Sequence, residues 1–480
     1  MTFFIMNDIK DWEDEYYRRM RLPAGDLHVY ANRELFEAME TQVFTMANNN
    51  LQIPGGHYLS YTPDVHVGVG TCIGTTAVWR AEEAYVSPSI VGSDIGCGMR
   101  VHVTNLQREE LQDLKLRRKL VRAVEKLLPA DSQSRGQFAD FRLEEVVRKG
   151  LHGLPRKYVP DAYTPKKATS LTHVEHSRFR FDEEYLERMP EAAWHRGHRQ
   201  LGTLGSGNHF AEIQALEIPE EGRATAEQWG LKDGQIIVMI HSGSRAWGGA
   251  VNELAGREVA KWMRGSGMGT ADPKLAFAPL DSEAGQLYLH LMYSALNYAV
   301  VNRHLIAYAI REAAKDVFGS CFEMRTLYDL MHNYAWEEEH EGEAYFVHRK
   351  GATRALPPGH PDNPEPYRAT GHPALIPGSM GDRVLPHGGP AAGAGELSFD
   401  LPRGGPGPLA ECDEAAGQRR GLRLGPWGRH AGRGRRQPAE PGGDRGRGAA
   451  GLQGCGRDHR QRGRCRTRGC RGEVRAACGH

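Results

Sequence analysis

Polar residues flanked by glycine recur along the first four-fifths of this 480-residue chain, and they are of the types that bind metals and anions. The segments are PDVHVGVG (63–70), GSDIGCGMR (92–100), LGSGNHFAE (204–212), HSGSR (241–245), MHNYA (331–335), VHRKGATRA (347–355) and IPGSMG (376–381). Glycine lets a backbone approach a ligand closely and supplies N–H groups for anions. Any single histidine among them is more simply a core or surface residue, and any single glycine a turn. Taken as a set, the segments predict a site for metal and phosphate.

Asp94 and Cys97 stand three residues apart in a glycine-rich loop, so both side chains can face one ion. With His209, His241 and His332 they form a set of thiolate, carboxylate and imidazole ligands. Such a set suits manganese, zinc, iron or cobalt rather than calcium. Two ions about 3.5–4 Å apart would suit phosphoryl chemistry, and a bridging thiolate would hold them close. The alternative for Cys97 is a small buried hydrophobic residue.

Four basic residues in these segments, Arg245, Arg349, Lys350 and Arg354, are candidates for contacts with phosphate or RNA. The alternative is ordinary surface charge. The segment IPGSMG offers backbone amides and Ser379 as a cradle for a purine or a phosphate, although it could also be a plain turn. No GxxxxGK[ST] pattern occurs, which excludes a P-loop NTPase.

These residues need elements to position them, and hydrophobic periodicity indicates both strands and helices. The apolar stretch 235–244 predicts a buried strand, while 106–128 and 286–318 have helical periodicity. Gly and Pro clusters predict loops at 54–56, 150–155, 357–364 and 371–378. The metal-binding residue types fall at or near the ends of expected strands. We therefore predict a single α+β domain with a large mixed sheet over residues 1–381.

The last 99 residues, 382–480, have a different composition, with 24 Gly, 19 Arg and no Lys, Ile, Tyr, Asn or Met. Their net charge is +9, against −8 for residues 1–381. Such a tail buries too little apolar surface to fold, so we expect it to be disordered. It could be an RNA-binding arm, or a zinc site through Cys455, Cys465, Cys470 and Cys478, although it contains no CxxC pair. It could also be translated out of frame, because its residue types have G/C-rich codons.

Membrane insertion and secretion are not expected. No apolar run reaches membrane-spanning length, and the N-terminal residues lack the apolar core of a signal peptide. We expect a cytoplasmic protein.

In this order, the seven segments resemble the RtcB family of RNA-splicing and repair ligases, over roughly residues 25–381. The resemblance implies an enzyme that joins an RNA 3′-phosphate or 2′,3′-cyclic phosphate end to a 5′-hydroxyl end, using GTP and two Mn²⁺ ions. Its RNA would be tRNA halves or damaged RNA, and some members use an archease-type activator. The implied first metal position is Asp94, Cys97 and His209, and the second is Cys97, His241 and His332. The implied GTP site comprises Asn208, His209, Phe210, Ala211, Glu212, His332, Asn333, Pro377, Gly378, Ser379 and Met380.

The chain departs from this family after Gly381. The family's guanylylated histidine lies in an HGAGR signature, followed by a lysine near the C-terminus, and residues 382–480 contain neither. The catalytic nucleophile is therefore unknown in this frame. If one extra base were inserted near Gly381, a suitable choice of codons makes 381–392 compatible with GTASYLMVGRP and 399–415 with STCHGAGRALSRNAMK. We therefore predict that the tail is out of frame and that the chain as written does not ligate RNA.

Two other functions remain as alternatives. The metal ligands could activate water in a dinuclear phosphoesterase. Alternatively, the chain could be an RNA-binding protein that acts through its Arg-rich tail, with a steeply salt-dependent affinity that is lost when 382–480 are deleted.

Overall fold

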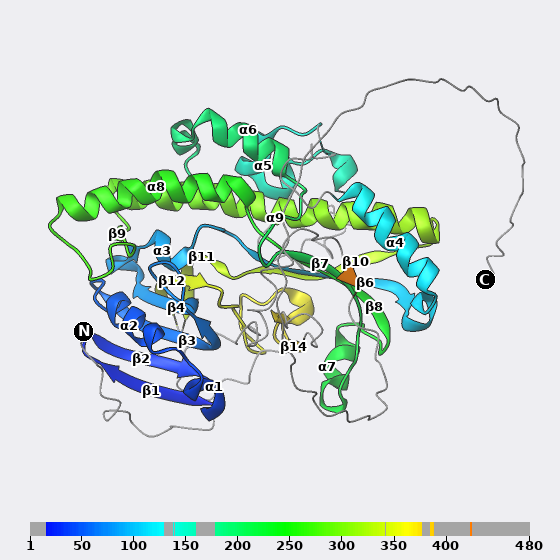
Figure 1. Ribbon diagram of the computed structural model, residues 1–480, viewed down its shortest axis with the longest axis horizontal. Helices are drawn as coiled ribbons and strands as arrows, with labels where there is room; N and C mark the ends of the chain where they lie inside the picture. The colour runs from blue at the N-terminus through cyan, green and yellow to red at the C-terminus, as the bar shows by residue number, and fades with distance from the viewer. Residues whose placement is uncertain are drawn as a thin grey trace, which may run out of the picture. The chain divides into compact units, whose positions relative to one another are not determined.

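Two β-sheets lie beside two long helices, and together they give a mixed α+β architecture (Figure 1). The computed structural model describes residues 16–128, 138, 140–159, 178–340 and 342–376, with short strands at 385–387 and 423–424. These residues belong to one compact unit, Met1–Gly428. The predicted α+β fold is confirmed. Pro377–Met380 and the rest of 382–480 lie outside the described residues.

The six-stranded sheet carries the N-terminal strands and has the order β1, β2, β3, β4, β12, β11. The strands are β1 (Tyr17–Leu22), β2 (Gly25–Tyr30), β3 (Gly56–His66), β4 (Ile73–Arg80), β12 (Glu343–Lys350) and β11 (Asn333–His340). All neighbours are antiparallel except β2 and β3, which are parallel. Val29, Tyr61 and Ala77 on three of these strands share a hydrophobic cluster with Val43 and Ala47 of helix α2 (Thr41–Asn50).

The five-stranded sheet has the order β10, β6, β8, β7, β15. Its strands are β10 (Met324–Met331), β6 (Gly98–Gln107), β8 (Gln235–Ser242), β7 (Phe210–Ala215) and β15 (Arg423–Leu424). Only β15 is parallel to its neighbour. Two small sheets pair β5 (Tyr85–Val86) with β9 (Ala278–Pro279), and β13 (Ala374–Ile376) with β14 (Leu385–His387).

Strand β8 is buried on both faces, which explains its continuous apolar sequence. Ile236, Val238 and Ile240 pack in a cluster with helices α4 (Leu114–Leu127) and α9 (Glu283–Phe318). Ile237 and Met239 alternate with them and pack in the cluster on the opposite face of the sheet. The predicted strand over 235–244 is confirmed.

The longest helix, α9 (Glu283–Phe318), runs along both sheets beside α8 (Arg245–Gly265) (Figure 1). It begins after Ser282, whose side chain accepts a hydrogen bond from the backbone N–H of Gly285, as an N-cap does. It ends at Gly319, which has a positive φ of 88°. The helix predicted over 286–318 is confirmed, three residues longer at its start.

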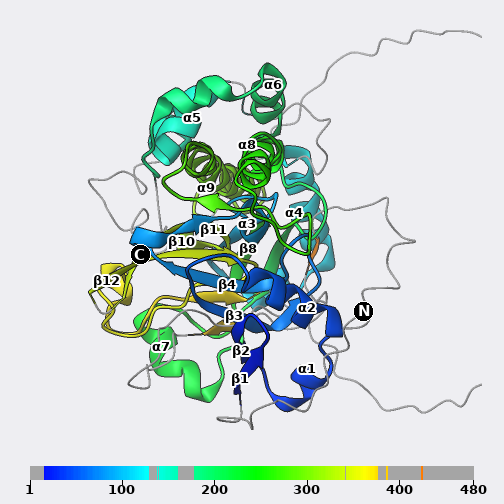
Figure 2. The same ribbon diagram turned by 90° about the vertical axis from the view of Figure 1, so that its left-hand side faces the viewer.

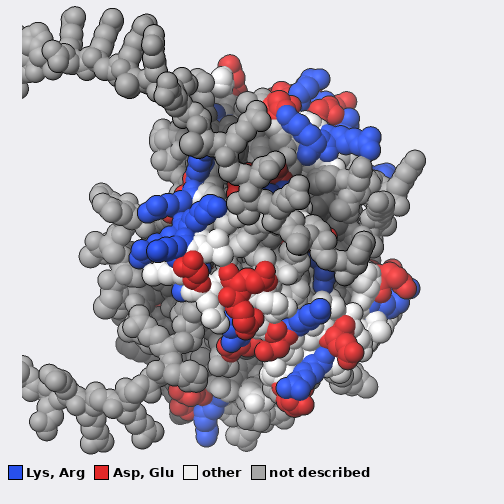
Figure 3. Space-filling model, turned by 90° about the vertical axis from the view of Figure 1, so that its right-hand side faces the viewer, with Lys and Arg blue, Asp and Glu red and all other residues white. Residues whose placement is uncertain are grey.

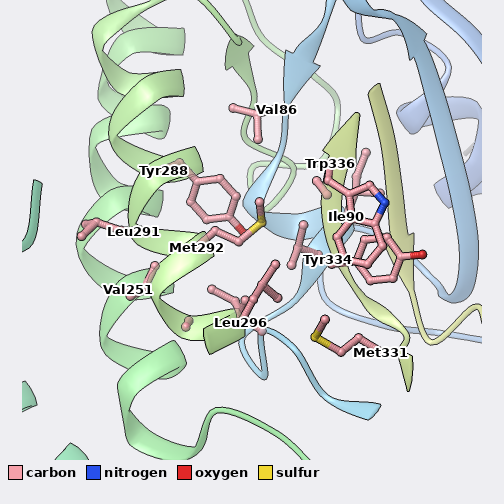
Figure 4. Close-up of a cluster of buried hydrophobic side chains, with 14 of the residues drawn as sticks. Val86, Ile90, Val251, Tyr288, Leu291, Met292, Leu296, Met331, Tyr334 and Trp336 are labelled. Atoms are coloured by element: carbon pink, nitrogen blue, oxygen red, sulfur yellow. The ribbon is translucent and has the colours of Figure 1, made fainter. Parts of the chain in front are cut away.

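Helix α9 packs its apolar side chains against α8 and the edge of the six-stranded sheet. Figure 4 shows Tyr288, Leu291 and Met292 of α9 in one buried cluster with Val251 of α8 and Trp336 of β11. Helices α5 and α6 cover the outer side of the α8–α9 pair, away from the strands (Figure 2). The long helix is therefore fixed from several sides.

The remaining helices are short. They are α1 (Arg33–Glu37), α2 (Thr41–Asn50), α3 (Pro88–Val91), α4 (Leu114–Leu127), α5 (Leu143–Lys149), α6 (Glu191–Gln200) and α7 (Arg223–Gln228). None of the helices in the described part of the chain is long and apolar enough to cross a membrane.

The prediction of one helix over 106–128 was wrong at its start. Strand β6 continues to Gln107, and a 3₁₀ turn at Arg108–Leu111 follows it. Gln107 and Glu110 form a capping box that starts this turn, and Asp113 then caps α4. Capping thus divides a segment with continuous helical periodicity. The predicted loop 371–378 likewise contains strand β13.

Candidate metal centre and nucleotide site

Four of the five predicted metal ligands lie where strands of the five-stranded sheet begin or end. Cys97 directly precedes β6, His209 directly precedes β7, His241 lies near the end of β8, and His332 directly follows β10. The antiparallel register pairs Met99 with His241. An antiparallel strand begins where its neighbour ends, so these four residues lie at the same end of the sheet. The prediction that these residues lie at or near strand ends is confirmed, whereas their role as metal ligands stays a prediction.

The five side chains form two overlapping trios that share Cys97. One trio is Asp94, Cys97 and His209, and the other is Cys97, His241 and His332. The Cys97 Sγ atom lies 3.5 Å from His209 Nε2 and 3.2 Å from His241 Nε2. His209 Nε2 is 2.7 Å from Asp94 Oδ2, and the Nε2 atoms of His241 and His332 are 3.3 Å apart.

The donor atoms of each trio are spaced to hold one metal ion. Within each trio they all lie within 4.8 Å of one another. Zinc-type bonds to sulfur, nitrogen and oxygen measure about 2.0–2.3 Å, so ligand atoms around one ion stand a few ångströms apart. The sulfur is the only donor that the two trios share, which makes Cys97 the one residue placed to bridge two ions.

Backbone contacts set the orientation of His241. Its Nδ1 atom lies 3.0 Å from the carbonyl oxygen of Asn208, which accepts the ring N–H. This bond turns Nε2 toward Cys97 and, in the neutral ring, leaves that atom as the one that can bind a metal.

The carboxyl group of Asp94 is suited to a cation. Burial by itself raises its pKa, but the hydrogen bonds with His209 and Cys97 and the nearby positive charge together outweigh burial, and the net pKa lies below that of an ordinary aspartate. Arg245 contributes in the same direction at longer range. Asp94 therefore carries its negative charge at neutral pH.

Two glycines leave the space that these ligands occupy. A Cβ atom on Gly243 would lie 2.4 Å from Asp94 Oδ1. A Cβ atom on Gly205 would lie 2.5 Å from His209 Nδ1, and Gly205 also has a positive φ of 107°. The glycine-rich sequence around the ligands thus has a steric cause at these two positions.

Sequence reasoning missed Asn302 and Arg303, two buried polar residues of α9 that hold the ligand-bearing segments together. Asn302 accepts a hydrogen bond from Gly202 N at 2.7 Å and donates to Gly243 O at 3.1 Å. Arg303 Nη1 donates to Gly96 O at 2.7 Å and to Ser242 O at 3.0 Å. These carbonyls lie one residue before Cys97 and one residue after His241. The only signal in the sequence is a polar pair inside an apolar helix.

A buried ion pair in turn holds Arg303. Its Nε and Nη2 atoms donate to the two carboxylate oxygens of Asp329, at 3.0 and 2.8 Å. Arg100 of β6 lies on the other side of the same carboxylate, at 2.8 Å. We call Asn302, Arg303 and Asp329 the α9 clamp. The alternation along β6 and β8 places this clamp on one face of the sheet and Cys97 and His241 on the other.

With this geometry the chain can be compared with known proteins. The family model described as "tRNA-splicing ligase RtcB" matches residues 46–385. The chain belongs to the RtcB family. It is 37% identical over 425 residues to the tRNA-splicing ligase RtcB of Thermococcus kodakarensis, covering 86% of this chain and 85% of that protein. The same-named proteins of Archaeoglobus fulgidus and Pyrobaculum aerophilum are 37% and 38% identical, covering 78% and 74% of this chain and the same shares of their own lengths. The resemblance stated above is confirmed.

The GTP-site residues that the RtcB resemblance implies lie partly on the ligand-bearing face of the sheet. Phe210 lies beside His241, with ring centroids 5.4 Å apart, and Glu212 follows on the same face of β7. Ala211 is buried in the opposite cluster, so only its backbone could face a nucleotide. Asn333 uses its amide to join Asp94 O and Gly351 N. Pro377–Met380 lie outside the described residues.

Arg245 has an unusual backbone conformation at the start of α8. It is the only residue other than glycine with a positive φ, 53°, within the described residues. Its side chain is partly buried, and its Nε atom donates to Thr203 Oγ1 at 3.3 Å. Burial lowers its pKa, while Asp94 opposes that shift. Strained backbone persists where the surrounding structure needs a side chain in one place. Arg245 lies near Asp94, and its contact with phosphate stays a prediction.

The other three predicted phosphate contacts are buried. Arg349 is fully buried and pairs with Glu338, with Nη2 3.1 Å from a carboxylate oxygen. The Arg349 guanidinium holds the pKa of Glu338 far below its usual range, although burial alone would raise it. Arg354 is buried near Glu338 and lies 3.5 Å from Asp362. The carboxylate of Glu338 already neutralises the buried charge of Arg349, so the structure does not support its predicted contact with phosphate.

Lys350 is likewise a structural residue instead of a surface cation. Its Nζ atom donates to the backbone carbonyls of Val69, Thr71 and Ser89, at 3.1, 2.8 and 3.0 Å. Burial lowers the pKa of Lys350 to about 8. The ammonium group thereby joins the loop after β3 to helix α3, which leads into the Asp94 loop. Its predicted role in binding phosphate is not supported.

Proposed function

We propose that this chain, with its reading frame restored after Gly381, is an RNA ligase. It joins a 3′-phosphate or 2′,3′-cyclic phosphate end to a 5′-hydroxyl end, with GTP and two Mn²⁺ ions. The observation that carries the proposal is the buried sulfur of Cys97, which lies within 3.5 Å of both His209 and His241. The names of the relatives support tRNA as one substrate class.

Asp94, Cys97 and His209 would hold one Mn²⁺, and Cys97, His241 and His332 the other. When bound, the ions supply positive charge that stabilises the oxygens of the reacting phosphates. Five side chains from four separate segments of the chain must keep a fixed geometry for this, because a small displacement of a positioned group lowers the rate strongly. The α9 clamp and the carbonyl of Asn208 provide that rigidity.

The nucleotide would lie on the face of the sheet that carries His241. Phe210 offers an aromatic surface for a base, and the Glu212 carboxylate can accept the N–H donors of guanine. Arg245 supplies a guanidinium that can bind phosphate through charge-assisted hydrogen bonds. The segment Pro377–Met380 would complete this site with backbone amides.

The proposed reaction proceeds by nucleophilic catalysis on phosphorus. A histidine attacks the α-phosphate of GTP and releases pyrophosphate, and the guanylate is then passed to the RNA 3′-phosphate. The 5′-hydroxyl finally attacks that phosphate and releases GMP. Two easier steps replace one difficult step. The chain as written has no HGAGR signature to supply this histidine. We propose that residues 382–480 are translated out of frame, and that the polypeptide as written forms no guanylate.

Sequencing of the gene and a labelling assay test this function. We expect resequencing to remove one base near codon 381 and to restore HGAGR. The restored protein, incubated with Mn²⁺ and GTP labelled at its α-phosphate, should carry an acid-labile guanylate, and the chain as written should carry none. An intact gene that encodes the Gly/Arg tail would disprove the frameshift. Metal-dependent release of phosphate from RNA, without any guanylate, would favour the dinuclear phosphoesterase.

A further inference from the structure

Helix α4 (Leu114–Leu127) is strongly basic, although residues 1–381 are acidic as a whole. It carries Lys115, Arg117, Arg118, Lys119, Arg122 and Lys126 against a single acidic residue, Glu125. Lys115, Lys119, Arg122 and Lys126 follow one another at intervals of four, three and four residues. In a helix with about 3.6 residues per turn, this spacing places them on one face, over a length of about 16 Å.

This basic face points to solvent because the opposite side of the helix is fixed in the core. Leu120 and Val124 are buried in the cluster that α4 shares with Ile306 and Ile310 of α9. Lys115, Arg118, Lys119, Arg122 and Lys126 are all exposed. Figure 3 shows the side of the molecule on which α4 lies, with Lys and Arg side chains gathered in a group. The amphipathic pattern of the helix therefore presents its charges outward.

The exposed cations of α4 differ from two exposed basic residues of α8 in their ion pairing. None of the five has an ion pair with a carboxylate in the part of the chain that the structure describes. On α8, by contrast, Arg257 lies 3.6 Å from Glu253, and Lys261 lies 3.7 Å from Glu258. Charges that repel one another on a single face gain from an anionic partner, and here no carboxylate supplies one.

The start of α4 lies beyond the end of β6 that is farther from Cys97. Cys97 lies at the start of β6, and α4 follows the other end of that strand, after Gln107. Ten residues of strand span about 33 Å. We infer that the basic face of α4 binds the phosphate backbone of the RNA body, at a distance from the ends that are joined. This inference rests on the proposed function, because that function supplies the RNA.

The observations favour RNA over a membrane surface or an acidic protein. An interfacial helix buries apolar side chains in lipid, but Leu120 and Val124 already pack against α9. Contacts between a duplex and a protein are made largely to phosphates, and a row of cations on a rigid helix suits a regular backbone. The acidic remainder of residues 1–381 would repel RNA elsewhere and so direct it to this face.

The test compares two variants of the full chain in RNA binding, measured by fluorescence anisotropy across a range of salt concentrations. The α4 variant combines Lys115→Gln, Lys119→Gln, Arg122→Gln and Lys126→Gln, which keep helix propensity while removing charge. The control combines Arg257→Gln and Lys261→Gln on α8. The probes are a hairpin RNA with a 3′-phosphate and a six-nucleotide RNA with the same end. Both variants keep the Arg-rich tail, so its contribution cancels.

We expect the α4 variant to bind the hairpin more weakly, and the slope of log affinity against log salt to become shallower by up to about 3.6, or about 0.9 for each phosphate contact. The control should match the unmodified chain, and the affinity for the short RNA should not change. Equal hairpin affinities in all three proteins would overturn the inference, as would an equal loss for both RNAs. Binding of α4 to anionic vesicles or to an acidic protein, with unchanged RNA affinity, would also overturn it. A Cys97→Ala variant separates the two claims, because it should keep hairpin affinity even if the proposed ligation fails.

Discussion

Gly243 lies where a methyl group would collide with the carboxylate of Asp94, at 2.4 Å. Gly243→Ala should displace that carboxylate, because the new Cβ atom would overlap both of its oxygens and its Cγ atom. We expect affinity for Co²⁺ or Mn²⁺ to fall by roughly 10–100-fold, the usual effect of disturbing a residue that supports a metal ligand. Absorption of the Co²⁺–thiolate complex would measure it without reference to activity. Gly249→Ala is the matched control, since a Cβ atom there meets no atom within 4 Å. Equal metal affinity in both variants would contradict this steric account.

At the scale of elements, α9 acts as the support of the site through Asn302. Asn302→Ala removes the partners of Gly202 N and Gly243 O, which should cost about 2–4 kcal/mol of folding stability, since buried polar groups are left unsatisfied. Metal affinity should fall as well, by roughly 10–100-fold. The control is Asn297→Ala, at an earlier position of α9. There the buried side-chain amide donates to Val147 O and Phe179 O instead. Denaturant unfolding should show similar losses in both variants, whereas a metal titration should show a loss only for Asn302→Ala. A control that lost metal affinity equally would argue for general destabilisation.

Lys350 links the loop after β3 to α3. Because its ammonium group is buried, it makes the free energy of unfolding depend on pH. Its pKa is lowered to about 8 in the folded protein, while an unfolded lysine titrates near 10.4. Between these values the unfolded chain binds more protons than the folded protein, so stability rises with pH in that window. Relative to a Lys350→Met variant, the unfolding free energy should rise by about 1–2 kcal/mol from pH 7.5 to 9.5. Urea unfolding at both pH values checks this. The same pH dependence with and without the lysine would show that another group is responsible.

At the scale of the whole molecule, local patterns in the sequence predicted the cluster of Asp, Cys and His residues that the structure brings together, but not the residues that support it. Asp94, Cys97 and His209 were recognisable because residue type and flanking glycines are visible without a fold. The positions of strand β8 and helix α9 followed from apolar periodicity. Arg303 could not be assigned, because its carbonyl partners lie about 60 and 200 residues away and only the fold brings them together. Arg349 looked like a phosphate contact because the sequence does not show its buried partner. The pairing of β11 with β12 brings Glu338 to it.

The measurement that tests the central claim most directly is ligation by the frame-restored protein and its Cys97→Ala variant, with Cys321→Ala as a control at an exposed free cysteine. The substrates are RNA ends that carry a 3′-phosphate and a 5′-hydroxyl, supplied with GTP and Mn²⁺. We predict efficient joining by the restored protein and the control. Cys97→Ala should be slower by roughly 10²–10³-fold or more, the scale of losing a preorganised electrostatic group. Joining at the normal rate without the Cys97 sulfur would contradict the account.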